Sequence, residues 1–306
     1  MLNAIKDGNV VRIEGVLSEV DIDYKTFKKD GVDVNAIGGV IKVRVETEIN
    51  SKPVTLEIPV HMFAAQLTNA GMPNPAYESI EKIKNEYVSI AASDYSRADC
   101  VRITKGAINM NEYYGADERL ISFPRITASF VSKIRREDCT PKADFTVTFM
   151  VGKAAPEVDR EGIETGRYKI MGMIPQFAGK IDVVPFFAVN PGVIDAVSQY
   201  WSEGDTVKAT GKLNFTSETK EVEVKVDFGD PVKDVRTISL SELIITGGSS
   251  TPLDGEFAIN YDDVKEALEK RKSRLEESKE KAKNKGTAGK APAAHTSANK
   301  FSDLGF

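Results

Sequence analysis

Apolar and polar residues alternate with a period of two through most of residues 9–250. Because successive side chains of a strand point to opposite faces, this alternation is typical of half-buried antiparallel strands. Glycine and proline clusters, such as residues 72–75 and 229–231, separate the alternating runs. The pattern therefore predicts a mainly β protein, with strands in residues 10–17, 40–46, 54–60, 121–134, 145–151, 167–174, 181–189, 206–215, 221–228 and 236–246.

Two stretches interrupt the strands with apolar residues spaced for one face of a helix, at residues 74–86 and 191–201. Each follows about three strands and precedes a further pair. Three strands, a helix and two more strands is the order of an OB fold, a five-stranded Greek-key barrel. We therefore expect two tandem OB-fold domains, at residues 8–120 and 121–248.

Residues 249–306 differ in composition from the two expected barrels. The Gly, Ser, Thr and Pro residues of 247–259 predict a linker, and Asn260 can cap a helix whose first turn is acidic. The charged helix expected at 261–283 has a thin apolar face, so it should be largely solvated. Residues 284–299 have the composition of a disordered tail, before the apolar final residues FSDLGF.

The charge balance limits how this chain could bind nucleic acid. Lysine and arginine number 41 and aspartate and glutamate 46, a formal net charge of −5. An acidic body argues against a histone-like binder that relies on a global positive field. If the chain binds DNA, it needs a local basic groove combined with base stacking.

Several common classes of protein are disfavoured. The two cysteines, Cys100 and Cys139, are too few and too scattered for a disulfide framework, and they fit a reducing compartment. The start of the chain has no apolar signal region, and no run of about 18 apolar residues exists. We expect a cytoplasmic protein without a membrane partner.

Residues 182–217 resemble the middle of bacterial-type single-stranded DNA-binding proteins. The resemblance rests on an apolar-aromatic strand at 183–189, a helix ending in Tyr200 and Trp201, and the segments 204–207 and 210–213. Residues 237–246 are similar to the closing strand of that family. The resemblance implies an OB fold and single-stranded DNA binding with little sequence preference, in DNA replication, recombination or repair. Two OB units on one chain are more like phage or other divergent members.

The family's C-terminal end implies a second kind of partner. Its members commonly finish with a disordered linker and a short acidic-aromatic tip that recruits replication and repair proteins. Here the tip has a single acid, which departs from the several acids usual in the family. The residues expected to bind a partner protein are Phe301, Asp303, Leu304 and Phe306. The sequence leaves open whether the chain forms a homo-oligomer.

Single-strand binding needs cations that follow the phosphates and rings that stack on bases. The interleaving of basic and aromatic residues gives the candidates. Residues 24–29 are expected in a strand-end loop beside the binding face of the first barrel, whereas Phe186, Phe187 and Trp201 are expected in the core. The candidate DNA-binding residues are Tyr24, Lys25, Phe27, Lys28, Lys42, Arg44, Lys133, Arg135, Arg136, Tyr168, Lys169, Phe177, Lys180, Lys208 and Lys212.

Enzymatic chemistry has little support in the sequence. Of the two histidines, His295 is in the expected disordered tail and His61 is expected as a barrel residue, and neither a zinc spacing nor a phosphate-binding loop is present. We expect no enzyme, no cofactor and no metal. The alternative to DNA binding is an OB-barrel structural or adaptor protein that binds other proteins in a viral or replication assembly, which the acidic body favours.

Overall fold

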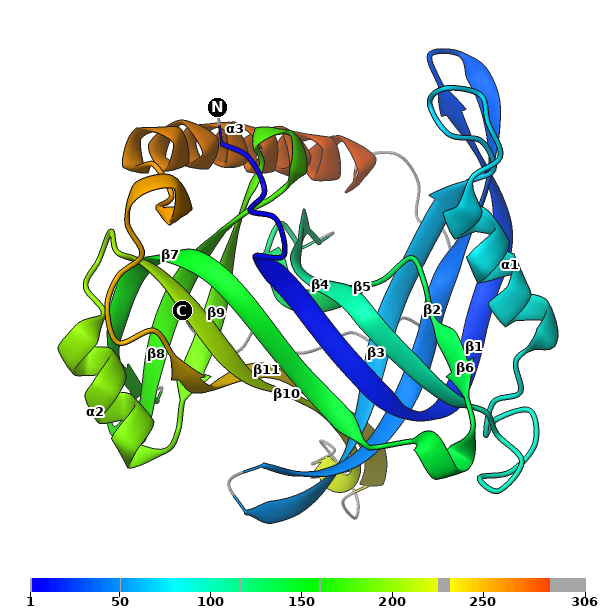
Figure 1. The fold of residues 1–306 in the computed structure, drawn as a ribbon, viewed down its shortest axis with the longest axis horizontal. Coiled ribbons are helices and arrows are strands. Elements are labelled where there is room, and N and C mark those ends of the chain that lie inside the picture. Colours follow the sequence, from blue (N-terminus) through cyan, green and yellow to red (C-terminus); the bar gives the residue numbers. More distant parts are fainter. Residues whose placement is uncertain (1, 50, 116, 160, 225–231, 287–306) are drawn as a thin grey trace.

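The computed structural model describes residues 2–49, 51–115, 117–159, 161–224 and 232–286. Its first barrel contains β1 (Asn9–Lys29), β2 (Val32–Ile49), β3 (Lys52–Ala65), β4 (Cys100–Tyr114) and β5 (Leu120–Thr127) (Figure 1). The strands pair in the order 1-2-3-5-4, and pairing of β1 with β4 closes the ring. The β3–β5 pair is parallel, and α1 (Pro75–Glu86) lies between β3 and β4 in the chain.

The second barrel repeats this arrangement with β7 (Lys142–Val158), β8 (Glu164–Pro175), β9 (Ile181–Ala188), β10 (Thr206–Val224) and β11 (Val232–Gly248). Its strands pair in the equivalent order, β7-β8-β9-β11-β10, and pairing of β10 with β7 closes the ring. The β9–β11 pair is parallel, like β3–β5. The helix α2 (Pro191–Tyr200) takes the place of α1. This is the OB order in both halves, so the predicted mainly β fold with two OB-type barrels is confirmed.

The two barrels divide later in the chain than the sequence suggested. We expected the boundary between residues 120 and 121, but β5 pairs with both β3 and β4 and therefore belongs to the first barrel. The connection to β7 contains β6 (Ser132–Ile134), which pairs with β4, and the short 3-10 helix η1 (Arg136–Asp138). The composition gave no sign of this boundary, because β5 alternates like every other strand.

The barrels share one sheet and one core. The start of β1 pairs antiparallel with β7, from Asn9 opposite Val147 to Glu14 opposite Lys142. Figure 1 shows these two long strands side by side at the centre of the molecule. Buried residues of both barrels, including Ile13 and Phe145, form one continuous apolar cluster. Because strand pairing and core both cross the boundary, the barrels form a single packed body.

An ion pair at the boundary reinforces this joint. Glu14 of β1 accepts hydrogen bonds from Arg102 Nε at 2.7 Å and from the Thr140 backbone N–H at 2.6 Å. The Arg102 hydrogen bond is the main cause that holds the pKa of Glu14 below its ordinary value, against the effect of burial. The carboxylate therefore links β1, β4 and the connection between the barrels.

Both barrel helices begin where the sequence predicts. Asn74 and Asn190 are the N-caps, and each is followed by a proline, which fits the first helical turn without losing a hydrogen bond. The side chain of Asn190 accepts from the Gly192 N–H at 2.9 Å. The predicted core residues Phe186, Phe187 and Trp201 are buried, which confirms that prediction.

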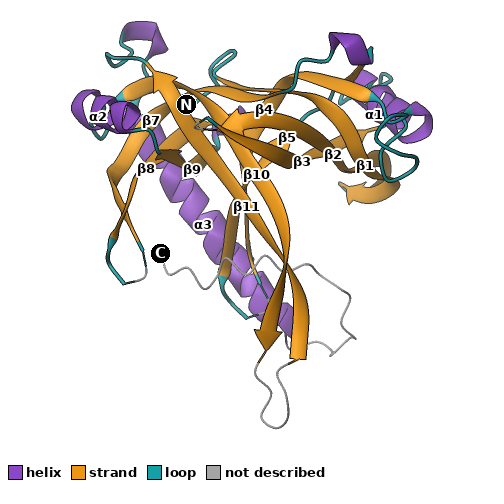
Figure 2. Cartoon of the chain, turned by 90° about the horizontal axis from the view of Figure 1, so that it is seen from below, coloured by secondary structure: helices purple, strands orange, loops and turns teal. Residues whose placement is uncertain are grey.

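The C-terminal helix α3 (Tyr261–Gly286) is present as predicted, and most of its described side chains are exposed or half-buried, but a narrow stripe packs on the barrels. Val264 and Ala267 are buried against Met150 and Ile181 of the second barrel. In Figure 2, α3 runs diagonally across the molecule beneath the strands. Its charged face also contributes, because Arg271 donates to Glu112 of β4, with Nε 2.9 Å from Oε2. The helix therefore connects the two barrels.

The expected partner-binding residues Phe301, Asp303, Leu304 and Phe306 lie outside the described residues, as does His295. Within the described ranges, no helix has the length and apolar character needed to cross a bilayer.

Candidate nucleic-acid interface

Two aromatic rings and a lysine form an exposed cluster on the outer face of the first barrel. Phe27 of β1 and Phe63 of β3 have exposed fractions of 37% and 56%, and their ring centroids are 5.9 Å apart at a tilt of 50°. Lys25 is on the same side of β1 as Phe27, is exposed, and forms no ion pair with another described residue. We call Lys25, Phe27 and Phe63 the hairpin patch.

Residues 24–29 form the end of strand β1, and the predicted loop is wrong. The chain pairs with β2 as far as Lys29, opposite Val32. Alternation along the strand therefore sends Tyr24 to the other face, where its hydroxyl donates to Glu81 of α1 at 3.0 Å. Lys28 shares the parity of Tyr24 and is exposed. The structure thus separates Tyr24 and Lys28 from Lys25 and Phe27.

Gly38, which lies opposite Phe63, explains why the ring of Phe63 is exposed. Gly38 of β2 is the cross-strand partner of Phe63. A Cβ on Gly38 would lie 3.0 Å from Cδ2 of the Phe63 ring and 2.6 Å from the Met62 carbonyl oxygen. Only glycine leaves this space, and the ring stands beside a stretch of backbone without side chains. Phe63 was missed in the sequence, because the exposure of this ring depends on Gly38 in another strand.

The outer face continues from the hairpin patch across β5 to β4. His61 of β3 pairs with Thr127 of β5, which pairs with Ala107 of β4. The Thr127 hydroxyl donates to Asn109 Oδ1 at 2.7 Å. Burial, and then the charge of Arg125, hold the pKa of His61 below its ordinary value, which favours the neutral imidazole. We call the surface from His61 through Thr127 to Ala107 the outer-face track.

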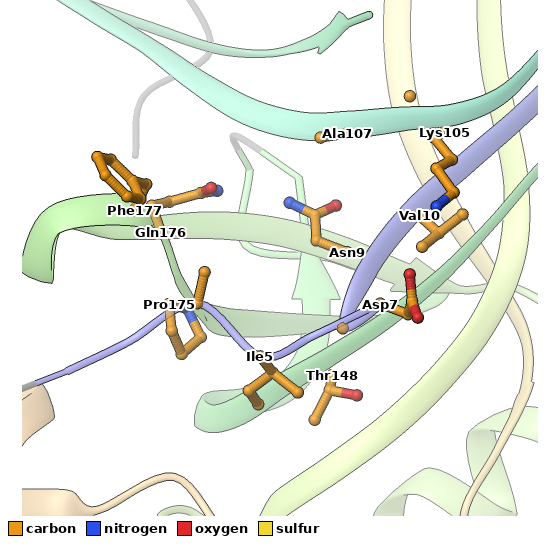
Figure 3. Close-up of a pocket in the computed structure, with 13 residues that line it drawn as sticks. Ile5, Asp7, Asn9, Val10, Lys105, Ala107, Thr148, Pro175, Gln176 and Phe177 are labelled. Atoms are coloured by element: carbon orange, nitrogen blue, oxygen red, sulfur yellow. The ribbon is translucent and has the colours of Figure 1, made fainter. Parts of the chain in front are cut away.

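A groove of about 310 Å³ opens at the far end of this track, between the two barrels. Figure 3 shows Phe177 and Gln176 of the second barrel on one side, Lys105 of the first barrel on the other, and Asn9 between them. The rest of the lining includes Ala107 and Thr148 of the barrels, Pro175, and the N-terminal residues Ile5 and Asp7, with Asp7 on the same side as Lys105. We call this site the junction groove. The predicted candidate Phe177 is 86% exposed at its rim.

Hydrogen bonds within the first barrel and between the two barrels fix the walls of the junction groove. Asn9 binds the backbone of Ile108 twice, donating to its carbonyl at 2.7 Å and accepting from its N–H at 2.9 Å. Gln176 donates to the same carbonyl at 3.2 Å and to Asp182 Oδ2 at 3.0 Å. Asp182 also accepts from the Met110 N–H, and burial raises the pKa of this carboxyl above its usual range.

Most of the other predicted cations are held by acidic neighbours. Lys42, Arg44, Lys133, Arg135 and Lys212 each form an ion pair, with Glu19 at 2.5 Å, Glu46 at 3.2 Å, Asp99 at 2.7 Å, Asp138 at 2.7 Å and Asp144 at 3.6 Å respectively. Arg136 donates to the carbonyls of Tyr95 and Ala98. These side chains are distributed over both barrels and do not form a basic stripe.

The remaining candidates of the second barrel differ in exposure. Tyr168 packs against the core, and Lys169 is half-buried, so that burial lowers its pKa. Lys180, three residues after Phe177, and Lys208 on β10 are exposed and form no ion pair with another described residue. Of this group, Lys180 is the cation that the chain places next to the junction groove.

This arrangement suits flat, weakly charged groups better than a rigid polyanion. The hairpin patch and Phe177 offer open ring faces, and Lys25 and Lys105 offer cations beside them. The outer-face track, from His61 on β3 to Ala107 on β4, crosses two inter-strand spacings, which is about 10 Å. The surface can therefore stack on unpaired bases while a few lysines contact phosphates.

A protein-family model described as YorF matches residues 7–281 of the chain. No curated protein matches it. Among solved structures, the chain is similar to the wild-type single-stranded DNA binding protein from Thermus aquaticus, at 9% identity and a TM-score of 0.47, over 83% of this chain and 95% of that chain. It is also similar to a deletion mutant of that protein, at 10% identity and a TM-score of 0.48, over 81% and 95% of the two chains.

Proposed function

The chain belongs to the YorF family, and from the surface that its barrels present we propose that it binds single-stranded DNA with little sequence preference. The observation that carries this proposal is the hairpin patch, where two phenylalanine rings stand exposed on the outer face of an OB barrel, on the same side as Lys25, which pairs with no acid among the residues that the structure describes. OB barrels bind oligonucleotides on the face of their second and third strands, and Phe63 is on the third strand.

Stacking, rather than charge, provides most of the proposed affinity. Each base that stacks on an aromatic side chain contributes about 1–3 kcal/mol, and every base has a face that can stack. The net charge of −5 and the many ion-paired cations leave few lysines for phosphates. Duplex DNA hides its base faces, so this surface favours a single strand.

The cellular role is part of the same proposal. The chain would protect or organise single strands during replication or recombination. Recruitment of partner proteins would depend on residues 301–306, which lie outside the described residues.

Fluorescence anisotropy of the full chain with a labelled oligo-dT strand tests this function. We expect tighter binding to oligo-dT than to a duplex of equal length. If three lysines contact phosphates, log K should fall with log[salt] at a slope of about −2, because each contact on a single strand contributes about −0.7. Equal affinity for duplex, or co-purification with a protein partner that nuclease does not disturb, would favour the adaptor function instead.

A further inference from the structure

We propose that the junction groove is a binding site for one unstacked nucleobase, so that a single strand bound to the first barrel continues onto the second. This inference depends on the proposed function and extends it to a site between the barrels. The groove, at about 310 Å³, has the size of a small-ligand pocket. The lining includes Gly8, Gly106 and Ala107, which occupy little space, and Phe177 lies at one end of the groove (Figure 3).

The exposure of Phe177 is the first argument. At 86% it is the highest among the exposed large apolar side chains of the described residues, and the ring has no aromatic partner there. Leaving an entire phenyl ring in water opposes the hydrophobic effect. A base stacked on the ring would remove one face of the ring and one face of the base from water.

The backbone that carries Phe177 is the second argument. Ala178, the next residue in the 3-10 turn η2 (Phe177–Gly179), has φ 60° and ψ 39°, a left-handed conformation that is unfavourable for a residue with a Cβ. Gly179 follows with φ 70°. Strained backbone of this kind persists where the surroundings fix it, and it is concentrated at binding sites. Here the strained turn directs Phe177 outward at the groove rim.

The rigidity of the groove is the third argument. Its walls come from both barrels. Asn9 of the first barrel and Gln176 of the second both donate to the Ile108 carbonyl, and Asp182 of the second barrel accepts from the Met110 N–H of the same strand as Ile108. A site held in this way is preorganised and loses little entropy when a ligand enters.

The outer-face track connects the hairpin patch to the junction groove. Ala107 ends the track and also lines the groove, and Lys105 lies two residues away on the same strand. Lys105 forms no ion pair with another described residue and can contact the phosphate next to the stacked base. One strand can therefore run from Phe63 to Phe177 within the about 4–16 nucleotides that an OB fold covers.

Two substitutions of Phe177 in the full chain test the site. Phe177→Ala should weaken the binding of a strand of about 16 nucleotides by about 5- to 150-fold, which corresponds to the loss of one stacked base. The affinity for a strand of about four nucleotides, which fills only the hairpin patch, should hardly change. Because the side chain is exposed, the melting temperature should stay unchanged.

Phe177→Trp adds a spectroscopic readout. The native Trp201 is buried and donates to the Ser249 carbonyl at 2.8 Å, so it reports little of the surface. Oligo-dT should quench the introduced indole at position 177. The matched control is Phe257→Trp, at a phenylalanine that is 61% exposed on η3 (Gly255–Phe257), where no quenching is expected.

The outcomes separate this inference from the proposed function. If oligo-dT binds but Phe177→Ala leaves both strand lengths unaffected and the new indole is not quenched, the groove is not a base site and the function stands. If the unmodified chain does not bind oligo-dT, the function itself fails. Quenching of the introduced indole, together with the length-dependent loss, supports the inference.

Discussion

Replacing both Phe27 and Phe63 with alanine is expected to weaken oligo-dT binding by at least about 30-fold. The two rings provide stacking surfaces, and loss of about 1 kcal/mol or more at each corresponds to about 2 kcal/mol or more in total. Both side chains are partly exposed on the outer face, so the barrel should remain folded. Anisotropy titrations and a thermal melt of the double variant measure the two quantities.

Phe257→Ala is the control for this experiment, because Phe257 is similarly exposed but belongs to η3, beyond the second barrel. It should leave oligo-dT affinity unchanged. An equal loss of affinity in control and double variant, or an unchanged affinity in the double variant, would contradict the role of the hairpin patch.

Arg271→Ala is expected to release α3 from the barrels. The side chains of Arg271 and Glu112 are 20% and 6% exposed, and removing the arginine leaves the glutamate buried without its cation. Breaking a buried ion pair costs about 3–5 kcal/mol. The helix can respond by moving away so that water reaches Glu112, and the cost then appears as lost docking. Hydrogen exchange or limited proteolysis of residues 261–283 detects the release.

Lys270→Ala is the matched control on the same helix. In the part of the chain that the structure describes, Lys270 pairs only with Glu266 one turn earlier, and both side chains are more than 60% exposed. Exposed pairs of this type contribute about 0.3–0.5 kcal/mol, so protection of α3 should hardly change. Equal protease sensitivity of the two variants would show that the Arg271–Glu112 pair does not hold the helix.

The fold was largely predictable because OB barrels have a regular sequence pattern. Period-two alternation identified the strands, and the spacing of apolar residues identified both barrel helices. The closing strand of the first barrel was assigned to the wrong unit, because alternation shows that a strand exists and carries no information about its partner. The pairing of β1 with β7 depends on contacts distant in sequence, which a local pattern cannot reveal.

The candidate site was predicted only in part. Phe27 and Phe177 were found from local aromatic-basic composition, but Phe63 was missed because its exposure depends on a glycine in another strand. Lys42 and Lys133 resemble groove cations in sequence, whereas in the folded chain each meets an acid from a different segment. The packing of α3 was underestimated since its few apolar residues meet a surface formed by other parts of the chain.

Photo-crosslinking of the full chain to a strand that contains 5-iodo-deoxyuridine tests the central claim most directly, since it identifies the rings against which bases lie. The account predicts crosslinked peptides that contain Phe27 or Phe63 and, with a strand of about 16 nucleotides, Phe177 as well. Crosslinks confined to other exposed rings, such as Tyr200 or Phe257, would contradict it.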